Sequence, residues 1–304
     1  MNHVCKECGK EFKERGLHGH IMKTHDITVP AYYEKHFPRF DLLTKEALPY
    51  QDYTAYFDAE FVSAENERKW LKSVEKEKAK EYLLRRLQKR MEMKKLTYAP
   101  SFVEFETSEL PPYKAYVYFF GSFENACSEI KVQPLLYDRK SVEPITVGKP
   151  TILIDSREQR PLIFPNSREQ KLTIGDYTLA GDDYTYTYVD RKSEGDFKNT
   201  ITQQQERFLR EIERAATLDS YIYVVVEESI KGLEQNNGVT CHKTNMKYVW
   251  SSMRKIQHVH PRRVQFVFTG SRENSQRIIP YLLTYGNKLW NVDVQYLLSV
   301  KGAV

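Results

Sequence analysis

The sequence lacks long apolar runs. Hydrophobic residues make up 40% of its 304 residues, which is ample for a core, yet no run approaches the roughly 20 apolar residues that a membrane-spanning helix needs. The N-terminal stretch MNHVCKECGK also lacks the apolar block of a secretory signal. The sequence therefore predicts an intracellular protein that is neither secreted nor membrane-bound.

Cysteine is also scarce, with four residues in the whole chain. Two residues separate Cys5 from Cys8, eleven more lead to His20, and a further four lead to His25. Without a secretory signal, this pattern favours metal binding over disulfide bonds. Thiolates and imidazoles at such spacing suit tetrahedral zinc, with the cysteines on a β-knuckle and the histidines on one helix face.

Residues 1–26 resemble the Cys-Cys-His-His zinc finger family, although the central spacer is one residue shorter than is usual there. Phe12 and Leu17 fall where the small apolar core of such a finger needs them, and His3 and His18 are two further imidazoles nearby. The resemblance implies bound Zn²⁺ and a DNA target, with a protein target as the alternative.

Residues 27–96 are predicted to be a helical connector. Residues 27–62 contain three prolines and no clean period, so we expect short helices or irregular structure there. From Ser63 to Leu96, Gly and Pro are absent and strong helix formers dominate, which predicts one long helix. Twelve Lys and Arg lie between Arg68 and Lys95, so this helix is either a solvated linker or a basic rod that follows the phosphate backbone of DNA.

Residues 97–135 contain the run FFGSFENA, in which Gly121 can end one helix and Ser122 can N-cap the next. This pattern resembles the small repeat associated with phage and homing endonucleases, and two short helices around such a turn are similar to a helix-turn-helix. The resemblance implies DNA binding by Phe120, Gly121, Ser122 and Asn125. A packing subdomain without DNA contacts is the alternative.

Residues 136–150 read as a linker, and residues 151–304 as an α/β domain with a mixed central sheet. Apolar and β-branched runs predict strands, whereas apolar residues at helical spacing predict helices. The expected strands are 151–154, 221–228 and 264–268, and the expected helices are 197–216, 245–259 and 272–289.

A hairpin from Ile174 to Asp196 carries the residues with catalytic character. Two β-prone runs flank a turn-forming Ala-Gly-Asp-Asp at residues 180–183. Asp176 is expected on the first strand, and Asp190 with Lys192 on the second, where side chains two apart share a face. Two carboxylates and an ammonium at one hairpin can hold a divalent cation and a phosphate.

The same residues resemble the nuclease domain of XPF and Mus-type excision-repair endonucleases, a branch of the PD-(D/E)XK class with a restriction-endonuclease-like fold. That family's signature is Gly-Asp, a variable hairpin, Glu-Arg-Lys, three residues and Asp, with Asp-x-Arg-Glu upstream. The chain departs from it at Asp190, where Glu is usual. The matching residues are Asp155, Arg157, Glu158, Gly175, Asp176, Asp190, Arg191, Lys192 and Asp196.

The resemblance implies metal-assisted hydrolysis of phosphodiester bonds. Asp176 and Asp190 would coordinate Mg²⁺ or Mn²⁺, with Asp155 or Glu158 completing the shell directly or through water. Lys192 would orient the attacking water and offset developing negative charge. Two arginines are candidates for phosphate contact: Arg157, and more weakly Arg191, which otherwise supports the site together with Asp196 in the second shell.

The catalytic resemblance implies an endonuclease selective for flap, fork or junction DNA in repair or recombination, and the accessory repeat implies sequence-dependent cutting. A phage or mobile-element origin fits, with the protein in the cytoplasm or nucleoid of a bacterial host. Because no tandem helix-hairpin-helix module follows the nuclease segment, the N-terminal modules would capture DNA. The family commonly pairs through its nuclease domain, which implies a homodimer. The alternative is a non-cleaving zinc-finger DNA-binding regulator or scaffold subunit.

Overall fold

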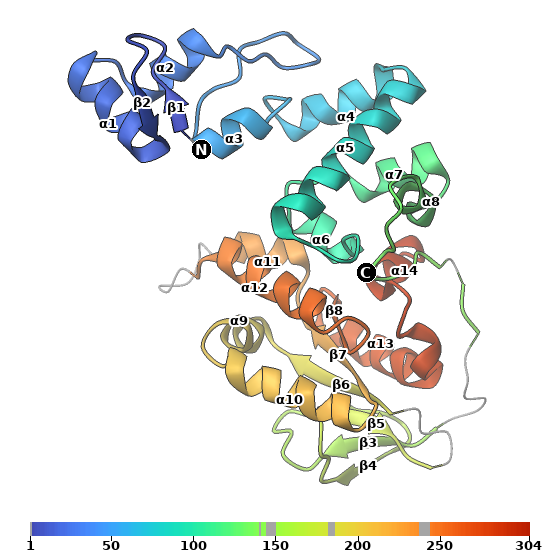
Figure 1. Cartoon of the computed structure of the whole chain (residues 1–304). Coiled ribbons are helices and arrows are strands. Elements are labelled where there is room, and N and C mark those ends of the chain that lie inside the picture. Colours follow the sequence, from blue (N-terminus) through green and yellow to red (C-terminus); the bar gives the residue numbers. More distant parts are fainter. Residues whose placement is uncertain (1, 140, 144–149, 182–185, 237–243) are drawn as a thin grey trace. The chain divides into compact units, whose positions relative to one another are not determined.

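The computed structural model describes residues 2–139, 141–143, 150–181, 186–236 and 244–304 (Figure 1). The chain divides into two compact units, Met1–Ala79 and Lys80–Val304. This division lies inside the predicted connector of residues 27–96. None of the helices in the described ranges combines the length and apolarity needed to cross a membrane.

The first unit begins with an antiparallel hairpin followed by a helix, as a zinc finger does. Tyr32, Tyr33 and Tyr56 from the following helices bury their rings in one core with Leu17 and Ile21 of the finger helix. Residues 27–62, expected to form short helices or irregular structure, contain two short helices and complete the core of the finger, because their aromatic side chains supply the apolar area that a short finger lacks. The elements are β1 (Asn2–Val4), β2 (Glu11–Lys13), α1 (Glu14–Thr24), α2 (Val29–His36), α3 (Tyr53–Asp58) and α4 (Ala64–Ser73).

The prediction of a single helix from Ser63 to Leu96 is wrong, because two helices occupy this segment. α4 ends at Ser73, and α5 covers Lys76–Lys94. Between them Val74 is extended, with φ −80° and ψ 155°, and the Ser73 hydroxyl donates to the Trp70 carbonyl at 3.1 Å. A β-branched residue after a back-bonding serine favours this interruption without any Gly or Pro.

The second unit opens with α5, α6 (Phe102–Glu106), α7 (Tyr113–Phe120) and α8 (Phe123–Glu129). The predicted turn between α7 and α8 is confirmed, with Gly121 at φ 84° and the Ser122 side chain accepting from the Asn125 backbone N–H. The Asn125 side-chain amide donates to the Phe120 carbonyl at 2.9 Å, which closes the end of α7. This segment packs on the α/β domain, with the ring centroids of Phe102 and Tyr296 5.7 Å apart.

The α/β domain is built on a six-stranded sheet in the order β4-β3-β5-β6-β7-β8. β3 pairs in parallel with β4, β5 is antiparallel to both β3 and β6, and β6, β7 and β8 run parallel to one another. The mixed central sheet that the sequence predicted is therefore confirmed. The strands are β3 (Ile152–Asp155), β4 (Ser167–Gln170), β5 (Tyr177–Leu179), β6 (Thr187–Lys192), β7 (Tyr221–Val226) and β8 (Val264–Phe268).

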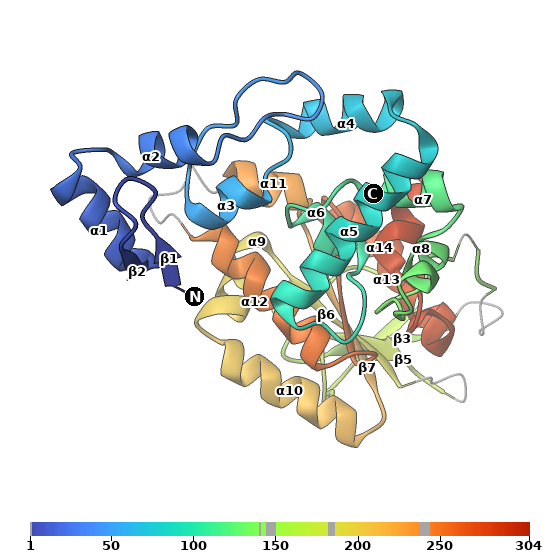
Figure 2. The same ribbon diagram turned by 45° about the horizontal axis from the view of Figure 1, so that its top comes forward.

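Helices cover both faces of this sheet (Figures 1 and 2). One apolar core joins the sheet to α9–α12, and a second joins it to α13, η1 and α14. The helix expected over residues 197–216 is two helices, α9 and α10, and the one expected over 272–289 is α13 followed by η1. The bounds are α9 (Glu194–Thr202), α10 (Gln205–Thr217), α11 (Ile230–Asn236), α12 (Met246–Val259), α13 (Arg272–Tyr285), η1 (Gly286–Leu289) and α14 (Val294–Val300).

Candidate active site and metal centre

The predicted hairpin is formed by β5 and β6, which pair antiparallel with Tyr177 opposite Val189. Asp176 lies immediately before β5, not on it, and its backbone N–H donates to the Val189 carbonyl at 2.8 Å. Gly175 has φ 60°, and a Cβ there would lie 2.8 Å from the Val189 oxygen. Only glycine fits this close crossing, which explains the Gly-Asp pair. The expected turn residues 182–183 lie outside the described residues.

Asp190 and Lys192 lie on the same face of β6, as the two-residue periodicity predicted. The Lys192 ammonium contacts Oδ1 of Asp190 at 2.5 Å. Asp190 is only 3% exposed, and among the described residues its second oxygen, Oδ2, has no hydrogen-bond partner. A buried carboxylate oxygen without a partner is costly, which makes it a natural position for a bound cation.

Asp176 interacts electrostatically with Asp190 and Lys192. Oδ2 of Asp176 accepts from the Arg191 backbone N–H at 2.7 Å. Burial, followed by the neighbouring Asp190 carboxylate, raises the pKa of Asp176 well above its usual value. Burial acts to lower the pKa of Lys192, but the Asp190 and Asp176 carboxylates outweigh it and raise that pKa to about 12. Lys192 is therefore an ammonium at neutral pH.

Glu211 on α10 is a member of the site that the sequence reading did not include. Its Oε1 accepts from the Gly175 backbone N–H at 2.9 Å. Burial, followed by Asp190, raises the pKa of the Glu211 carboxyl. The available signal was its position: Glu211 follows buried Phe208 by three residues and precedes buried Ile212, so an acid stands in the apolar stripe of the helix.

The upstream Asp155 is buried at the end of β3 and holds neighbouring chain segments. Its Oδ2 accepts from Nε of Arg157 at 2.7 Å, and its Oδ1 accepts from the Leu172 backbone N–H at 3.1 Å. Arg157 also donates to the Leu172 carbonyl, while 60% of its side chain stays exposed. Both Asp155 oxygens therefore hold the chain segments that precede the hairpin, at Arg157 and at Leu172.

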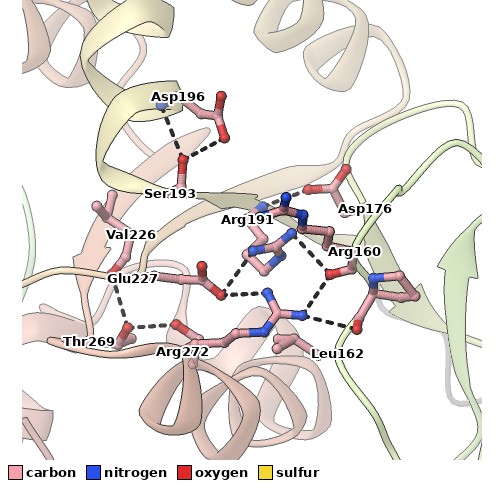
Figure 3. A network of polar contacts seen from close by, with 12 residues as sticks. Arg160, Leu162, Asp176, Arg191, Ser193, Asp196, Val226, Glu227, Thr269 and Arg272 are labelled. Carbon is pink, nitrogen blue, oxygen red and sulfur yellow. Dashed lines mark hydrogen bonds and ion pairs between the residues drawn. The ribbon is translucent and has the colours of Figure 1, made fainter.

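Arg191 is the centre of a buried ion-pair network (Figure 3). Its guanidinium lies 3.1 Å from Glu158 and 2.9 Å from Glu227 and is 9% exposed. Arg272, at the start of α13, contacts Glu227 at 3.1 Å and donates to the Arg160 carbonyl at 2.7 Å. This network clamps the loop after β3 against the ends of β6 and β7. Glu227 and Arg272 were not among the predicted site residues.

A cleft of about 710 Å³ opens over this arrangement, and its lining includes Asp176, Lys192, Arg157 and Asp196. Asp196 belongs to the start of α9, where its backbone N–H donates to the Ser193 hydroxyl and its Oδ2 accepts from that hydroxyl at 2.6 Å. Ser193 is therefore the N-cap of α9, and Asp196 lies in the first turn of that helix. The cleft therefore offers both acidic and cationic side chains to a phosphodiester.

The four predicted finger ligands are brought together. Sγ of Cys5 lies 3.6 Å from Nε2 of His25, Sγ of Cys8 lies 3.2 Å from Nε2 of His20, and the two imidazole nitrogens are 3.2 Å apart. Tetrahedral zinc with its usual Zn–S and Zn–N bonds separates ligand atoms by roughly 3.3–3.8 Å. The spare imidazole His18 instead contacts the Tyr33 hydroxyl at 3.3 Å.

Ligand spacing distinguishes the finger from the site at the hairpin. Among the described residues, the four finger side chains are the one group of three or more Cys, His, Asp or Glu whose ligand atoms lie within 4.8 Å of one another. The acids near the hairpin are more widely spaced. A cation there would be held by two carboxylates and by oxygens of other origin, such as water or phosphate.

A family model described as the ERCC4 domain matches residues 154–282, the segment that contains this hairpin. Residues 154–282 are an ERCC4 domain. This match includes the segment in which the Asp-x-Arg-Glu, Gly-Asp and Asp-Arg-Lys elements indicated an XPF-type domain. No curated protein matched the chain.

Two solved structures are similar to this chain over part of its length. XPF from Aeropyrum pernix in complex with DNA is 18% identical, covers 44% of this chain and 63% of its own, and gives a TM-score of 0.33. XPF from Aeropyrum pernix is 17% identical, covers 43% of this chain and 64% of its own, and gives a TM-score of 0.34. The similarity therefore spans less than two thirds of either XPF chain.

Proposed function

We propose that the ERCC4 domain is a divalent-metal-dependent DNA endonuclease centred on Asp176, Asp190 and Lys192. The observation that supports it most strongly is Asp190, a buried carboxylate with one oxygen on Lys192 and the other without a partner in the described structure. Such an arrangement is unfavourable for the fold alone, and a cation beside Asp190 and Asp176 offsets the cost.

The donor set suits Mg²⁺ or Mn²⁺. Asp176 and Asp190 supply carboxylate oxygens, which hard cations prefer, and the described residues that line the cleft include no thiolate or imidazole that would favour zinc. A metal bound there would polarise the scissile phosphate and lower the pKa of the attacking water. Asp155 and Glu158, held by Arg157 and Arg191, support this shell through water.

Lys192 acts through its charge. Because its pKa is about 12, it cannot accept a proton near neutral pH, so we assign it to orienting the attacking water and offsetting negative charge on phosphate. The exposed Arg157 guanidinium at the rim of the cleft contacts a neighbouring phosphate. Arg191 holds Glu158 and Glu227 in place and does not reach the DNA.

The N-terminal modules capture the substrate in this proposal. The finger holds Zn²⁺ through Cys5, Cys8, His20 and His25 and presents its helix to DNA. The turn between α7 and α8, with Phe120, Gly121, Ser122 and Asn125, adds a second contact. Preference for flap, fork or junction DNA, and pairing of two chains through the nuclease domain, follow from the XPF-type resemblance.

A cleavage assay with matched variants tests the proposal. Linear duplex, flap, fork, Holliday-junction and closed circular DNA are incubated with the chain and with Mg²⁺, Mn²⁺ or EDTA. We expect nicking of closed circles only with added metal, and its loss in Asp190→Asn. Asp219→Asn, an exposed acid paired with Arg263, is the control and should cut normally. Cleavage that persists in EDTA or in Asp190→Asn contradicts the mechanism, and tight binding without cleavage favours a scaffold.

A further inference from the structure

A second pocket in the Lys80–Val304 unit is lined mainly by cationic side chains. It has a volume of about 470 Å³, and its lining includes residues from the C-terminal end of α5 and from α12. Figures 1 and 2 show these two helices. The ERCC4 site uses none of its residues. The cations that line it are Arg90, Lys94, Lys95, Arg254 and Lys255, beside the imidazole of His258, and the acid is Glu104.

The charge of Glu104 is already neutralised. Its side chain is 3% exposed, and its Oε1 accepts from Nε and Nη2 of Arg90 at 2.9 and 2.7 Å. Its Oε2 lies 2.7 Å from Nε2 of His258. Burial opposes ionisation, but His258 and Arg90 outweigh it and lower the pKa of Glu104. Glu104 therefore organises the pocket floor without balancing the remaining cations.

The three lysines of the pocket lack acidic partners in the described part of the chain. Arg254 is positioned by Nη1, which donates to the carbonyl and to the hydroxyl of Thr107. Burial, followed by Arg90, lowers the pKa of Arg254 to about 10 and outweighs the opposing effect of Glu104. Within the described residues, Lys94, Lys95 and Lys255 form no ion pair with a carboxylate. Nδ1 of His258 is likewise buried without a hydrogen-bond partner in the described structure.

A helix-ending motif places Lys95 at the pocket. The Leu96 N–H donates to the Met91 carbonyl at 2.9 Å, which closes α5 in the manner of a Schellman motif. Lys95 occupies the left-handed position of that motif, with φ 52°, where glycine or asparagine is favoured. This motif fixes the backbone of Lys95 at the end of α5, where the residue lines the pocket.

We propose that this pocket binds a phosphate of the DNA backbone outside the catalytic cleft. It contains several cations in excess over one neutralised acid, which matches a phosphodiester. No Phe, Tyr or Trp is among the described lining residues, so a nucleobase has no ring to stack on, which favours backbone over nucleotide. The proposal rests on DNA being the substrate, but not on cleavage.

Binding of fluorescent duplex DNA by the full chain, measured by anisotropy without added divalent cation, separates this site from catalysis. The test variant is Lys95→Gln/Lys255→Gln. The control is Lys131→Gln/Lys247→Gln, which removes equal charge: Lys131 shares the left-handed backbone, with φ 57°, and Lys247 lies on α12 outside the pocket. We expect the test variant to raise Kd roughly tenfold and to reduce the salt slope by about one, with a change below twofold in the control.

Three results overturn the proposal: unchanged affinity in the test variant, equal weakening in both variants, or DNA binding unaffected while tripolyphosphate binding is lost. The last result, obtained by titrating tripolyphosphate in a calorimeter, assigns the pocket to a free polyphosphate. Cleavage rates at saturating DNA, measured separately with Mg²⁺, should be alike in both double variants. If neither variant cleaves DNA yet the test variant alone binds weakly, the endonuclease proposal fails and the phosphate pocket stands.

Discussion

The finger and the ERCC4 site differ in how closely their candidate metal ligands are grouped. In the finger, four ligands lie within 21 residues of chain and converge within 4.8 Å. In the ERCC4 site, Asp176 and Asp190 are positioned by strand pairing and by the Arg191 backbone N–H, with no close cluster of three ligands. We therefore expect the finger to need a cation to hold its small core together, whereas the sheet holds its acids in place regardless of a cation.

This difference has an energetic consequence. The finger ligands are stabilised when the metal binds, so its loss removes structure. The acids of the ERCC4 site repel one another and are buried, as the raised pKa values of Asp176 and Glu211 show. We therefore expect variants of the finger to lose folding, and charge-removing variants of the ERCC4 site to lose activity while keeping the fold.

Cys5→Ser is expected to have the largest effect. Cys5 is fully buried in the core of the first unit and belongs to the metal cluster. Structural zinc contributes about 10–16 kcal/mol in finger peptides, so zinc content should fall from one per chain to near zero and the first unit should unfold. Metal analysis and calorimetry measure both. His18→Gln is the control, because His18 contacts Tyr33 instead of the cluster; equal zinc in Cys5→Ser would refute the site.

Lys192→Ala should come next, with cleavage falling by roughly a hundredfold or more, as when one electrostatic group of a transition state is removed. Single-turnover rates on a nickable circle with Mg²⁺ measure it. Lys198→Ala removes another well-buried ion-paired lysine, bound to Glu194 on α9 outside the cleft. Similar rates in the two variants would show that Lys192 stabilises the fold and not the reaction.

Glu211→Gln should reduce the cleavage rate by roughly tenfold, which is the usual scale for a group that supports metal ligands. Glutamine can still accept from the Gly175 N–H, so the hydrogen bond is kept while the charge near Asp190 is removed. We expect a weaker apparent affinity for Mg²⁺ with unchanged DNA binding. A normal Mg²⁺ dependence would exclude Glu211 from the site.

Asp176→Asn should have the smallest effect on folding, and of opposite sign to that of Cys5→Ser. A carboxyl whose pKa is raised by folding loses stability as pH rises from about 4 through its folded pKa. At neutral pH without added metal, Asn should therefore raise the stability by about 1 kcal/mol, or roughly 2–4 °C in Tm. Mg²⁺ should raise the Tm of the wild type only. A lower Tm in Asp176→Asn would contradict the expectation that the buried Asp176 carboxylate destabilises the fold without metal.

Features coded by short-range patterns were predictable. The finger ligands follow from spacing along one hairpin and helix, and the turn at Gly121 and Ser122 follows from local capping chemistry. Strand β8 matches its predicted bounds because five consecutive buried residues form a distinct apolar run. The Asp190 and Lys192 contact needed only the alternation of side chains along one strand.

Features that depend on distant chain segments were not predictable in the same way. Strand β4 was missed because its Ser-Arg-Glu-Gln sequence is fully exposed and has no apolar face. Glu211 reaches the Gly175 backbone from a helix, and Arg272 reaches Glu227 from the start of another helix. Such partners are set by how helices pack on the sheet, which a linear pattern does not specify.

The most direct test of Asp190 as a metal ligand is a Mn²⁺ titration of the zinc-loaded full chain. Electron paramagnetic resonance measures the bound Mn²⁺ in the wild type and in Asp190→Asn. Zinc in the finger stays bound in both, so any difference reports on the ERCC4 site alone. The account predicts at least one Mn²⁺ per chain in the wild type that is weakened tenfold or more in Asp190→Asn, with the zinc content unchanged. Identical Mn²⁺ isotherms for the two proteins would contradict the assignment of Asp190 as a metal ligand.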